Sequence, residues 1–209
     1  MVGHDAGVCQ LWHRAGMDRR SALKALSACG PWALDSPLHA RPHAEALLRQ
    51  GGVVVVFRHA DAPGTFDPPG FSLNDCSTQR NLGPQGRDQA RQIGQWFAQR
   101  GLKPQTVRSS PWCRCQDTAR LAFGTAEVWP ALGSPVGVSP EVTTARATQW
   151  RQALQAASRR RPGFEVWVTH QFVMSAMADR SAASGEGWVI GPGPDGAAQI
   201  MATLPASQT

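Results

Sequence analysis

Four side chains suited to binding and attacking a phosphoryl group stand where predicted strands end. Arg58 and His59 directly follow residues 53–57, VVVVF, an apolar run that predicts a buried strand. Arg114 and His170 follow two further predicted strands along the chain. Because ligands of open α/β sheets bind at the carboxyl ends of the strands, these side chains are expected to surround one small volume.

The residue types indicate phosphoryl transfer. Guanidinium groups bind phosphoryl oxygens bidentately and stay charged at any working pH. Arg114 lies in the first turn of a predicted helix, whose N-terminus adds N–H donors for an anion. A neutral His59 could attack phosphorus, while a cationic second histidine would hold the transferring oxygens. Taken alone, residues 58–59 are also compatible with a solvated strand end.

Hydrophobic periodicity and Gly and Pro signals predict the elements that position these residues. Beyond the strand at 53–57, strands are predicted at 107–110, 165–169, 188–190 and 199–204. Helices are predicted from 84 to 101, from 111 to about 122, around 150–157 and from 172 to 177. This alternation of strands and helices predicts an α/β domain with a largely parallel sheet.

Composition predicts a soluble globular protein that binds anions. The 209 residues are 42% hydrophobic and 17% charged, and the net charge is +6, with Arg far more frequent than Lys. The arginines are scattered, and residues 159–161 are their only run of three, so no nucleic-acid partner is expected. No apolar run reaches the roughly 18–20 residues of a membrane-spanning helix, so no stable membrane insertion is expected.

Residues 1–50 differ from the rest and are predicted to form a separate, partly disordered leader. Arg19-Arg20, ahead of the mildly apolar residues 25–34, resembles a twin-arginine export signal. Residues 26–29, LSAC, resemble a lipoprotein processing box, and residues 38–40 hint at a signal-peptide cleavage site. A periplasmic or exported location is therefore predicted, with a cytosolic chain carrying a basic leader as the alternative.

The order of the motifs resembles that of the histidine phosphatase superfamily, also called phosphoglycerate mutase-like. The family's Arg-His-Gly signature has its counterpart in residues 58–60, RHA. Its Leu-Thr-x-x-Gly-x-x-Gln-Ala element corresponds to residues 82–90, LGPQGRDQA, and its Ser-Ser-Pro-x-x-Arg-Ala-x-Gln-Thr-Ala element to residues 109–119, SSPWCRCQDTA. A final Thr-His pair after a strand corresponds to residues 169–170.

This resemblance implies branch 1 of the superfamily, of the compact bacterial phosphatase type, with a three-layer α/β/α fold over residues 51–205. It implies a phosphatase in which His59 is the phosphorylated nucleophile. The remaining catalytic residues would be Arg58, Arg114 and His170. Gln171, through its backbone N–H, and Asp61 are further candidates for substrate binding. No cofactor or metal is implied, and the partner would be a phosphorylated small molecule or a phosphoprotein.

The sequence departs from the family pattern at the general acid. Gln171 stands where the phytase-like branch has an acidic Asp, and the remaining candidates are Glu127, Glu141 and Asp61. Without proton donation, release of an alkoxide slows by about 10²- to 10⁴-fold. A catalytically weak or silent phosphate-binding module of the same fold is therefore the alternative. Ala60 in place of the family's glycine motivates the same alternative.

The Pro- and Gly-rich segment 63–79 is expected to lie beside the pocket mouth and to influence substrate choice. Its Cys76 could pair with Cys113 or with Cys115 in an oxidising compartment. Alternatively, all three cysteines are small buried hydrophobic residues.

Overall fold

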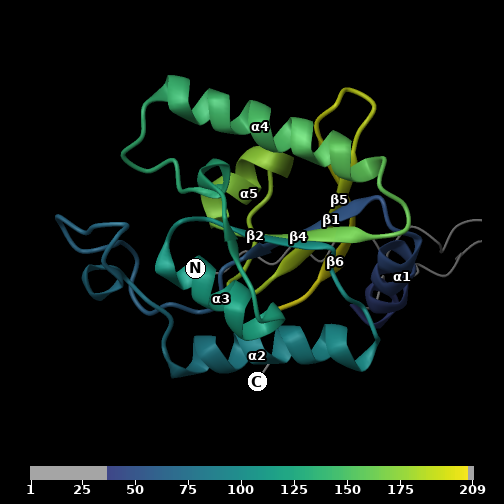
Figure 1. Ribbon diagram of the computed structural model, residues 1–209, viewed down its shortest axis with the longest axis horizontal. Helices are drawn as coiled ribbons and strands as arrows, with labels where there is room; N and C mark the ends of the chain where they lie inside the picture. Colours follow the sequence, from purple (N-terminus) through teal and green to yellow (C-terminus); the bar gives the residue numbers. More distant parts are fainter. Residues whose placement is uncertain (1–36, 207–209) are drawn as a thin grey trace, which may run out of the picture. The chain divides into compact units, whose positions relative to one another are not determined.

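The computed structural model describes residues 37–206 of the chain. A six-stranded sheet in the order β3-β2-β4-β1-β5-β6 lies between two layers of helices (Figure 1). The strands are β1 (Val53–Arg58), β2 (Thr106–Ser109), β3 (Glu127–Val128), β4 (Phe164–Thr169), β5 (Gly187–Pro192) and β6 (Ala198–Leu204). The helices are α1 (Pro37–Gln50), α2 (Pro84–Gln99), α3 (Cys113–Phe123), α4 (Pro140–Ser158) and α5 (Gln171–Ala178), with short 3₁₀ turns η1 (Cys76–Thr78) and η2 (Pro130–Leu132).

The sheet is mostly parallel, as predicted. β4 runs parallel to β1 and β2, and β3 runs parallel to β2. β5 is antiparallel to both of its neighbours, β1 and β6. Arg58 at the end of β1 pairs with Thr169 of β4, and Ser109 of β2 pairs with Val168. The carboxyl ends of β1, β2 and β4 therefore lie side by side.

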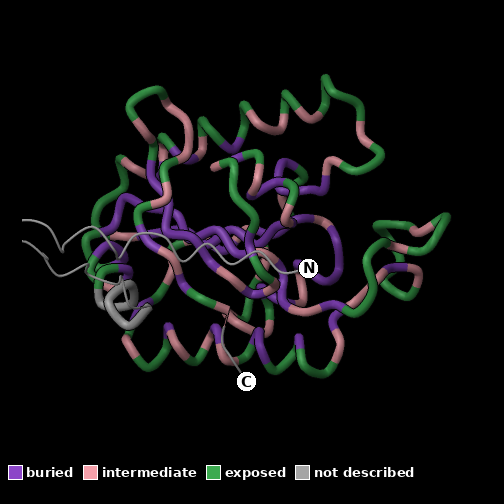
Figure 2. Tube along the Cα trace, turned by 180° about the vertical axis from the view of Figure 1, so that it is seen from behind, coloured by how far each residue is buried: buried purple, intermediate pink, exposed green. Residues whose placement is uncertain are grey.

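The valine run of β1 supplies apolar side chains to both faces of the sheet. Val53, Val55 and Phe57 pack with residues of α1, α2 and α3, whereas Val54 and Val56 pack with residues of α4 and α5. Alternate side chains of a strand point to opposite faces, so a strand with helices on both sides must be apolar throughout. The inner strands are accordingly buried along their length (Figure 2). The predicted three-layer α/β/α fold is confirmed.

Two helices illustrate how local signals set the boundaries. α2 begins with Pro84 in its first turn and buries Ile93 and Phe97 on one face. α4 is longer than its predicted core of residues 150–157, because Ser139 caps its N-terminus by accepting a hydrogen bond from the N–H of Val142. None of the helices in the described part of the chain is long and apolar enough to cross a membrane.

One helix lies inside the segment that the sequence assigned to a leader. α1 covers residues 37–50, and its Ala44, Leu47 and Leu48 are buried in the same core cluster as β1 and β6. This part of the predicted leader thus packs with the domain, because its leucines find apolar partners that the local sequence does not reveal. The twin-arginine and lipoprotein-box motifs fall on residues 1–36, which lie outside the described residues, whereas the cleavage-site hint at residues 38–40 falls in the first turn of α1.

Candidate functional site

The strand ends and the loops after them line a cavity of about 390 Å³. Pairing continues one residue past the strands, since the backbone N–H of His59 donates to Thr169 and that of Ser110 to Val168, both at 2.9 Å. All four catalytic residues predicted from the sequence line this cavity. The lining residues are Arg58, His59, Gly64, Thr65, Phe66, Asp67, Phe71, Arg80, Trp112, Arg114, Ser134, Val136, His170, Gln171 and Phe172.

His59 has the protonation state that a nucleophile needs. Its Nδ1 lies 2.8 Å from the backbone carbonyl of Ala60. A carbonyl only accepts, so Nδ1 carries the proton and Nε2 of the neutral ring keeps its lone pair. Burial lowers the pKa of His59 to about 3; the bond to Ala60 opposes this, and Arg114, Arg80 and Arg58 add to it. The free imidazole is therefore neutral at neutral pH.

His170 lies beside His59, with ring centroids 5.6 Å apart. Its Nε2 is 2.8 Å from Oγ of Ser110, and its position as N-cap of α5 fixes its backbone. Burial, then the neighbouring His59 and the arginines, holds the pKa of His170 well below its ordinary value. The cationic form expected from the sequence is thus disfavoured in the free protein, although a bound phosphate dianion would favour it.

Three arginines surround the two histidines. Arg58 donates to the carbonyl of Ala182 at 2.9 Å, Arg80 donates to the carbonyl of Ala62, and Arg114 is only 5% exposed. The Nε atom of each of these arginines is buried without a hydrogen-bond partner. Leaving a buried donor unpaired costs about 1–3 kcal/mol, so a bound oxyanion that accepts these N–H groups would be stabilised.

Asp67 is the carboxylate that lines the cavity. Its Oδ1 accepts from Nη1 of Arg114 at 2.8 Å and from the backbone N–H of Arg80 at 2.9 Å, and its Oδ2 accepts from the Trp112 indole at 3.1 Å. Burial raises the pKa of this carboxyl, but the hydrogen bonds, that from Arg114 foremost, outweigh it and leave the pKa below the ordinary value. Asp67 is therefore an ionised group that orients Arg114.

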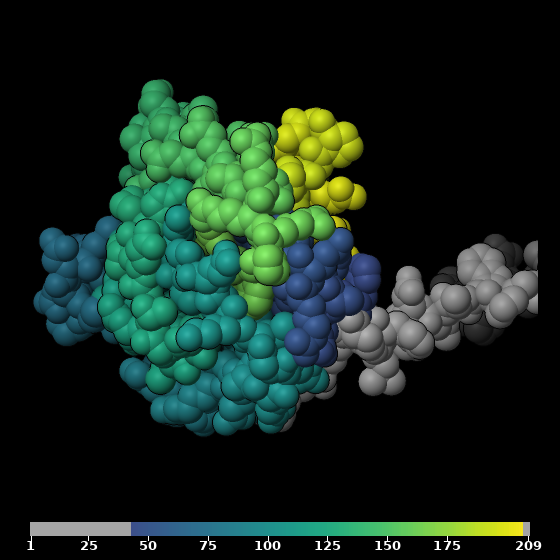
Figure 3. Space-filling model, turned by 45° about the vertical axis from the view of Figure 1, so that its right-hand side comes forward, coloured from purple at the N-terminus to yellow at the C-terminus, as the bar shows by residue number. Residues whose placement is uncertain are grey.

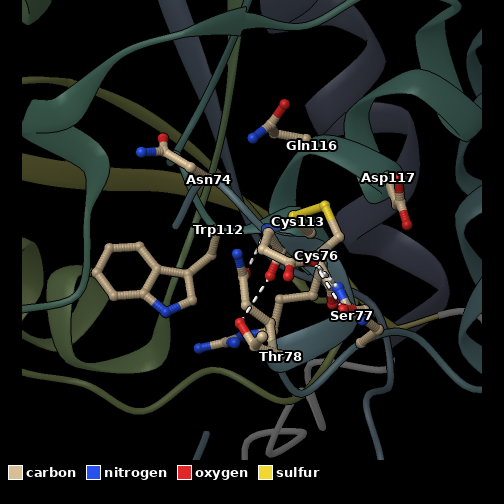
Figure 4. The surroundings of a disulfide bond; sticks show 12 residues. Asn74, Cys76, Ser77, Thr78, Trp112, Cys113, Gln116 and Asp117 are labelled. Carbon is tan, nitrogen blue, oxygen red and sulfur yellow. Dashed lines mark hydrogen bonds between the residues drawn. A yellow bond between two sulfur atoms is a disulfide. The ribbon is translucent and has the colours of Figure 1, made fainter. Parts of the chain in front are cut away.

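A disulfide fixes the segment that carries these residues. Cys76 in η1 is bonded to Cys113 at the start of α3, next to Arg114 (Figure 4). The side-chain carbonyl of Gln79 also accepts from the backbone N–H of Cys113 at 2.9 Å. Of the two pairings left open by the sequence, the structure contains Cys76–Cys113.

Cys115 is a buried free thiol, and its Sγ lies 3.6 Å from Nε2 of His170. Burial raises the pKa of this thiol to about 12, so it is protonated and not nucleophilic.

Of the other candidates from the sequence, only Gln171 lines the cavity among the described residues. The side chain of Asp61 does not line it, and the backbone of Asp61 lies beneath Gly86 of α2, where a Cβ would meet its carbonyl oxygen at 1.8 Å. Glu127 on β3 and Glu141 in the first turn of α4 are exposed and lie outside the lining. The proposed general acids are thus absent from the described lining of the cavity.

Sequence reasoning missed Arg80 and Asp67. Arg80 stands two residues before the motif that begins at Leu82, and its position relative to that motif was the signal available. Asp67 gave no signal, since it lies within a long Pro- and Gly-rich segment whose path depends on the disulfide. Among the described residues, no three His, Cys, Asp or Glu side chains lie together as a metal site.

The charges of the cavity lining suit the binding of a phosphate dianion beside a nucleophile. Three arginines against one aspartate leave an excess of two positive charges beside a neutral nucleophilic imidazole. A phosphate dianion has the complementary charge, and the bidentate guanidinium groups match its oxygens.

Comparison with known proteins agrees with this geometry. The family model described as histidine phosphatase superfamily (branch 1) matches residues 76–133, which include Arg80 and Arg114 but neither histidine. No curated protein matches the sequence.

Solved structures extend the comparison to most of the chain. The open reading frame Rv3214 from Mycobacterium tuberculosis has a TM-score of 0.55 at 17% identity, covering 74% of this chain and 97% of its own. A mycobacterial glucosyl-3-phosphoglycerate phosphatase complexed with VO3 has a TM-score of 0.51 at 15% identity, covering 74% and 99%. The protein histidine phosphatase SixA complexed with tungstate has a TM-score of 0.50 at 17% identity, covering 74% and 97%.

At these identities the likeness is one of fold. The resemblance predicted from the motifs is confirmed: the chain has the fold of these proteins and, over residues 76–133, the sequence pattern of branch 1 of the histidine phosphatase superfamily.

Proposed function

We propose that this protein is a phosphatase that hydrolyses a phosphomonoester or a phosphoprotein through a phosphohistidine on His59. The observation that carries the proposal is the set of three buried, unpartnered arginine Nε atoms around a neutral histidine. The similar structures include a protein histidine phosphatase and a glucosyl-3-phosphoglycerate phosphatase, which is consistent with this chemistry.

In this proposal the lining residues act in two steps, transfer of the phosphoryl group to His59 and its hydrolysis by water. Nε2 of His59 attacks phosphorus, the N–P bond forms, and the P–O bond to the leaving group breaks with its electron pair on oxygen. Water then attacks the phosphohistidine, the N–P bond breaks, and inorganic phosphate leaves the neutral imidazole. Arg58, Arg80 and Arg114 stabilise the charge on the transferring oxygens in both steps.

No side chain of the described lining is an efficient proton donor to the leaving oxygen. Asp67 is the only carboxylate among the described lining residues, and three donors hold it ionised. We therefore expect faster turnover of substrates whose leaving group is stable as an anion, such as an aryl oxide, than of alkyl esters.

Turnover of phenyl phosphate tests the proposal. The wild-type protein is expected to release phosphate, and His59→Ala is expected to lose this activity because no other group forms the covalent intermediate. Arg114→Lys is expected to keep about one hundredth of kcat/KM, since it retains the charge but loses the bidentate fork. Arg120→Lys, on the exposed side of the same helix, serves as the matched control.

The second candidate is a phosphate-binding module with little or no turnover. The lining favours it, because its one carboxylate, Asp67, accepts from three donors and does not supply a proton to a leaving group. Binding of inorganic phosphate by a well-folded wild-type protein that releases no phosphate from phenyl phosphate between pH 5 and 7 would select this candidate over the phosphatase.

A further inference from the structure

An apolar rim surrounds the mouth of the cavity. Phe66, Val136 and Phe172 line it although they are 70%, 55% and 53% exposed. They come from three segments far apart in the sequence: the loop after β1, the loop before α4, and the first turn of α5. Seven large hydrophobic side chains are exposed in the described part of the chain, and these three converge on one opening. Such a cluster at a pocket indicates a ligand surface, whereas scattered exposed residues need no explanation.

An aromatic wall leads from this rim to His170, the neighbour of the nucleophile His59. Phe71 lies 6.0 Å from Trp112 between ring centroids, and Trp112 lies 5.0 Å from the ring of His170. The indole N–H of Trp112 donates a hydrogen bond to Asp67, which fixes the orientation of the indole ring. The loop that contributes Phe66 and Phe71, drawn in blue, projects from the body at the left edge of Figure 3.

The charged side chains that line the cavity are mutual neighbours, the three arginines and Asp67. The lining contains three arginines, two histidines and Asp67, and Asp67 is already paired with Arg114. The described residues of the rim are uncharged. A second acidic or basic group on the substrate would therefore find no opposite charge at the rim to pair with.

We propose that the substrate is the phosphate monoester of a planar aromatic ring, whose ring packs between Phe66, Phe172 and the Trp112 wall. This inference rests on the proposed phosphatase function and names its substrate class. Aromatic side chains hold a ring through stacked and edge-to-face contacts in addition to area burial. An aryl oxide also leaves with little protonation, which suits a cavity whose one lining carboxylate is held ionised.

The test separates ring recognition from leaving-group ability. Benzyl phosphate and ethyl phosphate both release primary alkoxides of similar basicity, but only the first carries a ring. We expect kcat/KM for benzyl phosphate to exceed that for ethyl phosphate by about three- to tenfold, mainly through KM. In the double variant Phe66→Ser and Phe172→Ser this ratio should fall to about one.

Leu73→Ser is the matched control, because Leu73 is an exposed residue of the same loop that does not line the cavity. It should leave the ratio at the wild-type value, and circular dichroism would establish that all variants are folded. Equal kcat/KM for the two esters in the wild type, or an unchanged ratio in the double variant, overturns the ring proposal alone. Absence of turnover for both esters and for phenyl phosphate would overturn the proposed phosphatase and this inference with it.

The ring could belong to a free metabolite or to a tyrosine side chain. A phosphotyrosine peptide and phenyl phosphate distinguish these sources: higher kcat/KM for the peptide assigns a protein source, and higher kcat/KM for phenyl phosphate a small molecule. The same peptide with phosphoserine provides the comparison without a ring, and equal turnover of the two peptides contradicts the proposal.

Discussion

His59 combines two properties that burial brings together. Removal from water keeps the imidazole neutral, and the Ala60 carbonyl selects the tautomer whose Nε2 can attack. Removal from water also strengthens the field of the nearby arginines on a bound anion. The same environment therefore prepares the nucleophile and binds the group it attacks.

This environment makes stability depend on pH. The pKa of His59 is about 3 in the folded protein, against about 6.5 for an unperturbed histidine. Between these pH values His59 is protonated in the unfolded chain but neutral in the folded protein. The free energy of unfolding therefore falls as the pH drops through this window. At pH 5 the loss from His59 is on the order of 2 kcal/mol relative to pH 7.

Urea unfolding at pH 7 and pH 5 measures this effect. The fall should be smaller in His59→Ala than in the wild type. His43→Ala, which removes an exposed histidine of α1 that does not line the cavity, is the matched control. Equal falls in all three proteins would contradict the assignment of the effect to His59.

Asp67 is expected to act by positioning Arg114. Asp67→Asn keeps the shape but loses the charge, so kcat/KM should fall by a similar factor, about tenfold, for phenyl phosphate and for ethyl phosphate. A general acid would behave differently, because only the alkyl ester depends on protonation. A much larger loss for ethyl phosphate would therefore identify Asp67 as the acid. Asp88→Asn, at an exposed site on α2, is the control.

At the scale of elements, the Cys76–Cys113 disulfide joins the loop after β1 to the start of α3. The two cysteines are 37 residues apart in the sequence. A disulfide across a loop of this length restricts the unfolded chain and is expected to stabilise the folded protein by up to about 4 kcal/mol. Reduction should lower the melting temperature and also kcat/KM, because the loop carries Asp67 and Arg80.

The doubly substituted protein Cys76→Ser, Cys113→Ser supplies the control, since adding reductant should change neither of its values. Titration of the unfolded wild-type protein should show at least two more thiols after reduction than before, those of Cys76 and Cys113. Identical thiol counts would mean that this bond is absent in solution.

The elements also show what the sequence can predict. β1, β4 and α2 have strong apolar patterns and Gly or Pro boundaries, so their type and place were predictable, and with them the convergence of Arg58, His59, Arg114 and His170. The loop from Ala62 to Arg80 has no such pattern. Its path depends on the disulfide and on the ion pair of Asp67 with Arg114, which are contacts between residues 37 and 47 positions apart. Local sequence does not encode such contacts, so Asp67, Arg80 and the role of the aromatic rim emerged only from the structure.

At the scale of the whole molecule, α1 covers apolar surface near β6. Leu47 and Leu48 are 8% and 2% exposed, and burial of two leucines contributes about 3–6 kcal/mol. A chain that begins at Gly51 should therefore be less stable by about this amount than a chain that begins just ahead of Pro37. Urea unfolding of both chains measures the difference, and equal stability would show that α1 contributes little.

The position of α1 also bears on how the chain could be matured. A cut at residues 38–40, where the sequence hints at a cleavage site, would remove the first turn of α1. A cut ahead of Cys29, at the lipoprotein-like box, would leave α1 whole and seven residues, 30–36, between the modified cysteine and the helix. Seven extended residues reach about 25 Å. Processing at Cys29 would thus hold the start of α1 within about 25 Å of a membrane surface, on a tether too short for the domain to diffuse away from it.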